Sequence, residues 1–208
     1  MWGSEAALLA GRHELFATLL ERNGVPPDWR RSGSFETLVR LVLEQQVSLA
    51  SANAAFARLQ ARVGEVTPSA ILDSSDSELR ADGFSRQKSG YVRGIAEQID
   101  AGALDLAGLR ASDPSTDRRL LALRGVGPWT VACYRLFVLG DPDVWPTGDR
   151  ALYVSLGRNL DRDGVPARDE ADRIALAWSP HRSTAARMLW HDYLGGRSHV
   201  PDERAGFL

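Results

Sequence analysis

Two glycines set close together between helix-forming segments are the most chemically informative feature of the sequence. Gly125 and Gly127 flank Val126 in the segment LLALRGVGPWTVA, residues 120–132. Glycine adopts positive φ and lets a backbone come close to a ligand. The next helix is expected to begin at Pro128–Thr130, so its free N–H groups and positive dipole end point out of the turn. Such a turn can bind a phosphate, and a purely structural corner between two helices is the alternative.

The hydrophobic pattern that positions this turn is helical along nearly the whole chain. Without sustained period-2 alternation, few or no strands are expected, and the sequence predicts an all-α fold. Serines at positions 34 and 48 are expected to cap two of the helices. The expected helices cover residues 5–22, 34–46, 48–64, 86–101, 113–123, 129–139, 149–159, 168–178 and 182–194, with short helical segments after Pro68 and at 75–83.

The apolar residues predict where these helices pack. Those expected on the buried side of the first helix are Leu8, Leu15, Phe16 and Leu19. Those expected to hold the two helices around the glycine turn together are Leu120, Leu123 and Val126. The tryptophans expected in the core are Trp2, Trp29, Trp145 and Trp178, whereas Arg182 and Arg187 are expected to form surface ion pairs.

Composition excludes several classes of protein. The 208 residues fit one domain or two small lobes, and the formal net charge is −2. Cys133 is the only cysteine, which rules out an internal disulfide, a cysteine zinc site and a four-cysteine iron–sulfur cluster. No i, i+4 histidine pair occurs among His13, His181, His191 and His199, so no metal site is predicted from histidines. With neither a secretory signal nor a membrane-length apolar stretch, we expect a reducing, cytoplasmic location.

Five motifs together resemble one family of DNA repair enzymes. The pattern L-x-x-L-x-G-V-G-x-W-T resembles the helix–hairpin–helix of DNA glycosylases. The other four motifs are EQQVS (44–48), GFSRQK (83–88), DPDVWPTGDRAL (141–152) and WSPHRSTAARMLW (178–190). With these the chain resembles 3-methyladenine DNA glycosylase II, the AlkA type of the helix–hairpin–helix (HhH-GPD) superfamily, from about residue 35 to residue 194. It resembles the compact form, which lacks the extra N-terminal β-rich domain of larger members.

The resemblance implies a fold of two helical lobes with an active-site cleft between them. Residues 1–34 together with 141–208 would form a terminal lobe, and residues 35–140 a central lobe. The helix–hairpin–helix would occupy about residues 114–139 of the central lobe.

The same resemblance implies which residues act on the base. Asp149 matches the catalytic aspartate, and its place at a helix start also suits a plain N-cap, which is compatible with catalysis. Trp129, Trp190 and Tyr134 would line the base pocket. Tyr134 stands one residue after the family's usual tyrosine position, which is Cys133 here. Asp141 and Asp143 are expected to be solvated loop acids or turn residues.

DNA contacts and a cation site are also implied by the resemblance. The hairpin residues that would bind the DNA backbone are Gly125, Val126, Gly127, Trp129 and Thr130. The backbone carbonyls that would hold a Na⁺ or K⁺ ion are those of Leu121, Leu123 and Val126. Gln46 would fill the gap left by a flipped nucleotide, although many relatives have an apolar residue there.

The implied activity is a monofunctional DNA glycosylase of base excision repair. Strand-cutting relatives have a hairpin lysine where this chain has Trp129, and the only lysine, Lys88, lies far from that position in sequence. The expected partner is double-stranded DNA with alkylated bases such as 3-methyladenine and 7-methylguanine, bound by a monomer with no required cofactor. The alternatives are a glycosylase for another lesion, a non-catalytic helix–hairpin–helix DNA-binding protein, and a helical protein–protein adaptor.

Overall fold

The computed structural model describes residues 2–160 and 164–196. Every regular element in these ranges is a helix and none is a strand, which confirms the predicted all-α fold. None of these helices combines the length and apolarity that crossing a membrane requires. Residues 197–208 of the expected terminal lobe, including His199, lie outside the described residues.

Contacts divide the described chain into two units. The terminal unit contains residues 2–30, 140–160 and 164–196, and the central unit contains residues 31–139. The helices of the terminal unit are α1 (Trp2–Arg12), α2 (Glu14–Asn23), α10 (Arg150–Asn159), α11 (Arg168–Ala175), a 3₁₀ turn (Leu176–Trp178) and α12 (Arg182–Tyr193). Those of the central unit are α3 (Phe35–Glu44), α4 (Leu49–Val63), α5 (Pro68–Asp73), α6 (Asp76–Asp82), α7 (Arg86–Asp100), α8 (Ser115–Leu121), α9 (Pro128–Tyr134) and a π-helical segment (Arg135–Leu139).

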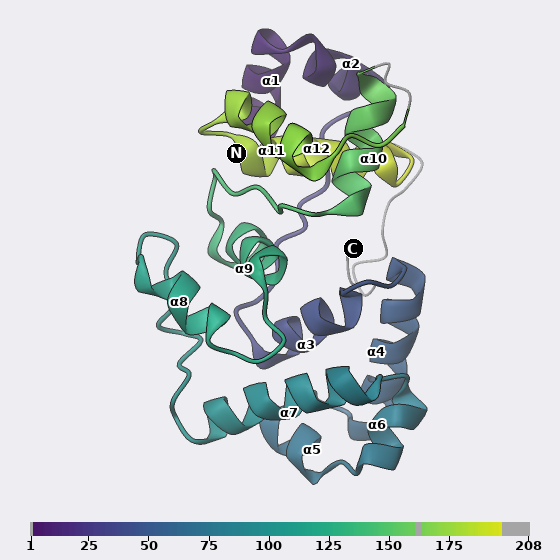
Figure 1. Cartoon of the computed structure of the whole chain (residues 1–208), viewed down its shortest axis with the longest axis vertical. Helices are drawn as coiled ribbons and strands as arrows, with labels where there is room; N and C mark the ends of the chain where they lie inside the picture. The colour runs from purple at the N-terminus through teal and green to yellow at the C-terminus, as the bar shows by residue number, and fades with distance from the viewer. Residues whose placement is uncertain (1, 161–163, 197–208) are drawn as a thin grey trace. The chain divides into compact units, whose positions relative to one another are not determined.

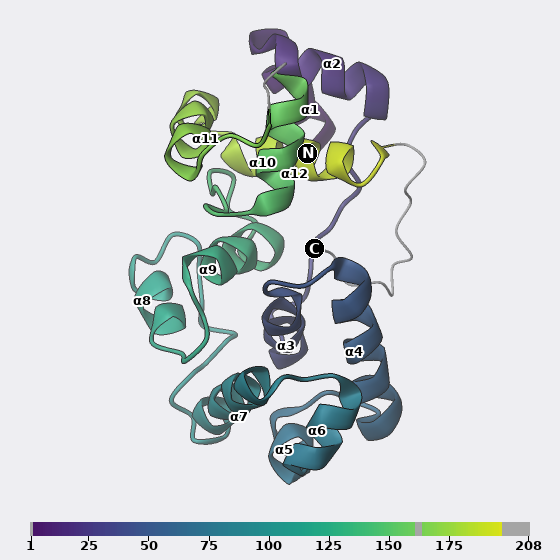
Figure 2. The same cartoon turned by 45° about the vertical axis from the view of Figure 1, so that its right-hand side comes forward.

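The central unit is built around α3. Leu38, Val39, Leu41 and Val42 of this helix are fully buried, and α3 contacts α4, α7 and α9 (Figure 2). Both predicted serine caps are confirmed: Ser34 Oγ accepts the N–H of Thr37 at the start of α3, and Ser48 Oγ accepts the N–H of Ser51 at the start of α4. Because α3 ends at Glu44 and Ser48 caps the start of α4, the chain turns within the segment 45–47.

The terminal unit is built around α12, which contacts α1, α2 and α10 (Figure 1). Every residue from 183 to 191 is buried, so α12 is covered on all its faces. Arg187 is therefore only 1% exposed, and its expected place in a surface ion pair is wrong. Arg182, at the start of the helix, forms the expected ion pair with Asp143 at 2.8 Å.

The expected helix over residues 5–22 is interrupted. His13 is extended, with φ −138°, and separates α1 from α2, which pack against each other. The break changes which face is buried, because Leu9 is 1% exposed whereas Leu8 is 48% exposed. Phe16 and Leu19 are buried as predicted, and so are Trp29, Trp145 and Trp178.

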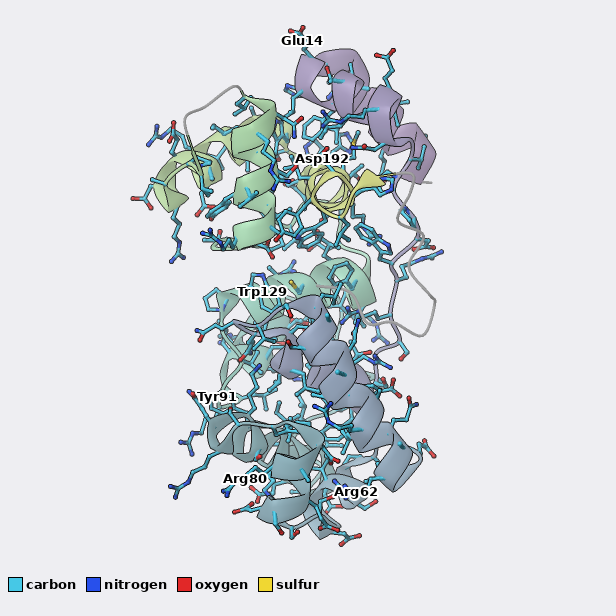
Figure 3. The ribbon with its side chains drawn as sticks, turned by 90° about the vertical axis from the view of Figure 1, so that its right-hand side faces the viewer. Glu14, Arg62, Arg80, Tyr91, Trp129 and Asp192 are labelled. Carbon is cyan, nitrogen blue, oxygen red and sulfur yellow. The ribbon has the colours of Figure 1, made fainter. Side chains whose placement is uncertain are left out.

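Asp192 joins three helices of the terminal unit. Its carboxylate accepts hydrogen bonds from Ser155 and Asn159 of α10, each at 2.8 Å, and from Asn23 of α2 at 3.0 Å. Arg22 adds an ion pair (Figure 3 labels Asp192). Burial opposes ionisation of Asp192, but these donors outweigh it and lower its pKa below the ordinary 3.8.

We predict that Asp192→Asn destabilises the protein by about 2 kcal/mol at pH 7, because an amide cannot accept all four donors. A lowered pKa stabilises the folded state above the ordinary value of 3.8, and this contribution is lost as the pH falls through the folded-state value. Urea unfolding from pH 7 down to pH 3 should therefore show the gap between variant and wild type narrowing below about pH 4. Asp169→Asn, at an exposed carboxylate of α11, is the control. A difference in the free energy of unfolding between Asp192→Asn and wild type that does not change with pH would contradict the lowered pKa of Asp192.

Candidate active site and nucleic-acid interface

The glycine turn lies between α8 and α9, as the sequence predicts. Gly125 has φ +87°, and the N–H of Val126 donates to the carbonyl of Leu123 at 3.1 Å. Leu120, Leu123 and Val126 are buried and hold the two helices together. Gly127, with φ −102°, is the N-cap of α9.

Gly125 is required for two independent reasons. Its positive φ is one that side chains rarely adopt, and a Cβ at this position would overlap the ring of Tyr91. Tyr91 comes from α7 and receives a hydrogen bond from Gln87 (Figure 3 labels Tyr91). The aromatic ring thus lies directly against the hairpin backbone, a contact that sequence analysis did not find.

A second unforeseen contact joins the hairpin to the segment after α3. The side-chain amide of Gln45 donates to the carbonyl of Gly125 at 2.8 Å and to the hydroxyl of Thr130 at 3.0 Å. Thr130 is 2% exposed. Its hydroxyl therefore stabilises the hairpin by accepting the Gln45 hydrogen bond. Contact between DNA and the backbone at Thr130 stays a prediction.

Gln46 is exposed and adopts a left-handed conformation. Helix α3 ends at Glu44 rather than at Gln46 as predicted, and Gln46 has φ +58°, the only positive φ of a non-glycine residue in the described chain. The ammonium of Lys88 donates to the carbonyls of Leu43 at 2.6 Å and Gln45 at 2.8 Å. The single lysine therefore satisfies carbonyls at the end of α3 and fixes the turn that presents Gln46.

A buried carboxyl lies beside this lysine. Glu44 is ion-paired with Arg31 at 2.9 Å, and both side chains are largely buried. Burial raises the pKa of Glu44 to about 7, against the opposing effect of Arg31 and Lys88. Burial also lowers the pKa of Lys88. Glu44, Arg31 and Lys88 therefore lie next to the turn at Gln46, and Lys88 binds its main chain.

Helix α9 supplies two of the predicted pocket residues to the central unit. Trp129 is partly exposed near the start of the helix (Figure 3). Tyr134 is 1% exposed, and its hydroxyl has no hydrogen-bond partner among the described residues. Burial raises the pKa of Tyr134 to about 12, so the hydroxyl stays neutral at physiological pH. The roles of Trp129 and Tyr134 in base binding stay predictions.

Asp149 and Trp190 come together in the terminal unit. Asp149 is the N-cap of α10, and its Oδ1 accepts the N–H of Leu152 at 2.9 Å. The indole N–H of Trp190, from the middle of α12, donates to the same oxygen at 3.2 Å. Both side chains are buried. Hydrogen bonds from N–H groups and a helix N-terminus favour the ionised carboxylate, which can stabilise a neighbouring cation.

The loop before Asp149 is held by a network that sequence analysis also missed. The N–H of Gly148 donates to the hydroxyl of Tyr153 at 2.6 Å, and this hydroxyl donates to Asp172 at 2.7 Å. The indole N–H of Trp145 reaches the same Asp172 oxygen at 2.8 Å. Asp172 of α11 thus fixes both ends of the segment that leads into Asp149.

No group of histidine, cysteine, aspartate and glutamate suited to a metal ion occurs in the described part of the chain. The predicted cation ligands are of another kind, the backbone carbonyls of Leu121, Leu123 and Val126 in the hairpin. The Leu123 carbonyl already accepts the Val126 N–H, but a carbonyl oxygen has a second lone pair. Oxygen donors of this type suit a hard monovalent cation, and the ion site at these carbonyls stays a prediction.

We predict that Gly125→Ala destabilises the protein by about 2–3 kcal/mol, because the methyl group meets Tyr91 and the positive φ becomes strained. Thermal unfolding followed by circular dichroism measures the loss. Adding Tyr91→Ala should restore the stability lost through overlap with the ring, and the loss due to the positive φ should remain.

Two other glycines provide controls for this prediction. A Cβ on Gly127 or Gly90 meets no atom within 4 Å, and neither residue has positive φ. Gly127→Ala and Gly90→Ala should therefore unfold close to the wild-type temperature. Equal losses in all three alanine variants would contradict the steric argument.

Comparison with known proteins places the fold and the hairpin in one family. Residues 39–180 match the model of the HhH-GPD superfamily base excision DNA repair protein. The chain is 32% identical to DNA-3-methyladenine glycosylase 1 of Schizosaccharomyces pombe over 162 residues, which cover 75% of this chain and 71% of that protein. It is 28% identical to YfjP of Bacillus subtilis over 165 residues, 75% of this chain and only 58% of YfjP. The match thus spans less than two thirds of that relative.

Solved structures lead to the same family. The S. pombe 3-methyladenine DNA glycosylase Mag1 in complex with abasic DNA superposes with a TM-score of 0.76 at 26% identity, over 90% of this chain and 95% of Mag1. A DNA-3-methyladenine glycosidase of Bacillus halodurans superposes with a TM-score of 0.70 at 28% identity, over 89% of this chain and 86% of that one. With a matching hairpin, fold and family model, the chain belongs to the HhH-GPD superfamily of base excision DNA repair proteins.

Proposed function

We propose that the protein is a monofunctional DNA glycosylase that flips alkylated bases, such as 3-methyladenine and 7-methylguanine, out of double-stranded DNA and hydrolyses their N-glycosidic bond. The observation that carries this proposal is the buried carboxylate of Asp149, held at the start of α10 by N–H donors from Leu152 and Trp190. The S. pombe and B. halodurans proteins that it resembles are named 3-methyladenine glycosylases, which supports the substrate class.

The chemistry of the substrate explains what such a carboxylate does. Alkylation at a ring nitrogen makes the purine cationic and weakens its bond to the sugar, so the base leaves without a general acid. As it leaves, the deoxyribose gains oxocarbenium character at C1′. An ionised Asp149 stabilises that positive charge and orients or deprotonates the attacking water. The products are the free base and an abasic site.

The residues proposed to bind the base are Trp129 and Tyr134 of the central unit and Trp190 of the terminal unit. A cationic base is attracted to an indole face by about 0.5–2 kcal/mol, which favours alkylated over normal purines. Trp190 has a second task here, because its N–H holds the Asp149 carboxylate. Its substitution would therefore affect both base selection and the position of the carboxylate.

The hairpin is the proposed DNA-backbone contact. Binding through the main-chain N–H groups of Gly125, Gly127 and the start of α9 depends on local dipoles, so a chain of net charge −2 can still hold a phosphate. The Val126 N–H itself is used within the turn, where it donates to the Leu123 carbonyl. The carbonyls of Leu121, Leu123 and Val126 would hold a Na⁺ or K⁺ ion there. Such an ion would supply positive charge next to a phosphate.

Strand cleavage through a lysine Schiff base is not part of the proposed activity. The hairpin has Trp129 where strand-cutting relatives have lysine. The ammonium of Lys88 is held by the carbonyls of Leu43 and Gln45 in the central unit. An amine used in this way serves the turn at Gln46 and is not presented as a nucleophile.

We predict that Asp149→Asn binds DNA with an abasic-site analogue within about threefold of wild type but releases bases at least 100-fold more slowly, because the neutral amide cannot stabilise the oxocarbenium ion. Chromatography of the bases released from methylated DNA under single-turnover conditions measures the loss. Asp169→Asn controls for a general effect of removing a carboxylate. Unchanged release by purified Asp149→Asn would overturn the assignment, and DNA binding without base release by the wild type would favour a non-catalytic binding protein.

A second prediction concerns the absence of lyase chemistry. Borohydride reduction of a mixture with abasic-site DNA should trap no covalent complex, because no lysine is placed in the hairpin. A known lyase treated in parallel shows that trapping works. A trapped complex that disappears in Lys88→Arg would show that Lys88 reaches the sugar and that the monofunctional reading is wrong.

A further inference from the structure

The turn formed by residues 45–47 joins α3 to α4 and presents Gln46 to solvent. Gln46 is the one non-glycine residue with positive φ in the described chain. Such a conformation costs free energy and persists only where the neighbouring structure enforces it. The contacts that enforce it should therefore identify what the turn is for.

The first anchor is the side chain of Gln45. Its Nε2 donates to the carbonyl of Gly125 and to the hydroxyl of Thr130, so both amide hydrogens are used and both acceptors belong to the hairpin. Gln45 is 80 residues from Gly125 in the sequence. The bond is therefore a specific tertiary connection and not a local turn motif.

The second anchor is Lys88, which holds the main chain of the same turn. Its ammonium binds the carbonyls of Leu43 and Gln45, on either side of the last residue of α3. Ser48 then caps α4 immediately after the turn. Gln46 thus stands between a residue tied to the hairpin and a residue that starts a new helix.

We propose that Gln45 is a positioning residue, which ties the turn presenting Gln46 to the phosphate-binding hairpin so that gap filling and backbone binding occur in one fixed register. The idea rests on the proposed function, in which Gln46 enters the gap left by the flipped nucleotide. When the hairpin fixes a phosphate, the Gln45 amide fixes how far along the strand Gln46 stands. Without the amide, the hairpin still binds DNA but the turn is no longer set relative to it.

The test uses DNA that the enzyme cannot cleave. The probe is a duplex with a tetrahydrofuran abasic analogue and 2-aminopurine next to it, whose fluorescence changes when its stacking partner changes. Gln45→Met keeps the length of the side chain and removes both donors. Gln60→Met, at an exposed position of α4, is the matched control.

We expect Gln45→Met and Gln46→Ala to lose most of the fluorescence response and to keep their affinity for the duplex. Each should reduce the change at saturation about fivefold, and the double variant should lose no more than either one, as expected for residues that act as a unit. Affinity for the duplex should fall by less than about threefold, since the hairpin is intact. Gln60→Met should behave as wild type.

A second pair of variants keeps the test decisive if Gln45→Met folds poorly. Thr130→Val removes the hydroxyl acceptor at nearly constant shape, whereas Thr130→Ser keeps it. The valine variant should lose much of the fluorescence response and the serine variant should restore it, with both unfolding close to the wild-type temperature.

Three outcomes would overturn the proposal: additive losses in the double variant, a full response from Gln45→Met, or a full response from Gln46→Ala. Because nothing is cleaved, the result is independent of base release. If the wild type releases no base, only the proposed function is wrong. If the losses in the double variant are additive, only the role of Gln45 is wrong.

Discussion

Two hydrogen bonds reach Oδ1 of Asp149 from different parts of the chain, one from the main chain of α10 and one from the indole of Trp190 on α12. The first follows from capping a helix and the second from packing that helix against α12. A carboxylate can stay ionised when buried only if donors replace the water it loses. The packing of α10 on α12, joined further along by Asp192, therefore supports the chemistry proposed for Asp149.

In the central unit the corresponding contacts fix the main chain of the hairpin, whereas those around Asp149 hold a charged side chain. Gly125 is kept glycine by its positive φ and by the ring of Tyr91, and its carbonyl is bound by Gln45. The main chain of the hairpin is thus fixed before any ligand arrives. A preformed set of N–H groups would lose little conformational entropy in the proposed contact with a polyanion, which matters for a chain with a small negative net charge.

Local signals made much of this predictable. The helical periodicity, the caps at Ser34, Ser48 and Asp149, and the glycine turn each depend on residues within a few positions of one another. The contacts that were missed join distant positions, as Lys88 does with Leu43, 45 residues away. The burial of Arg187 was missed because residue type alone favours exposure, and only α12 being covered on every face overrides it.

Lys88 has a consequence for control of the protein after synthesis. It is the only lysine among 208 residues, and its amine is already bound to two carbonyls. Every other basic side chain that could meet a phosphate is an arginine or a histidine. Acetylation of a lysine side chain removes its charge, and in this sequence it thus has a single target, whose amine holds the carbonyls of Leu43 and Gln45.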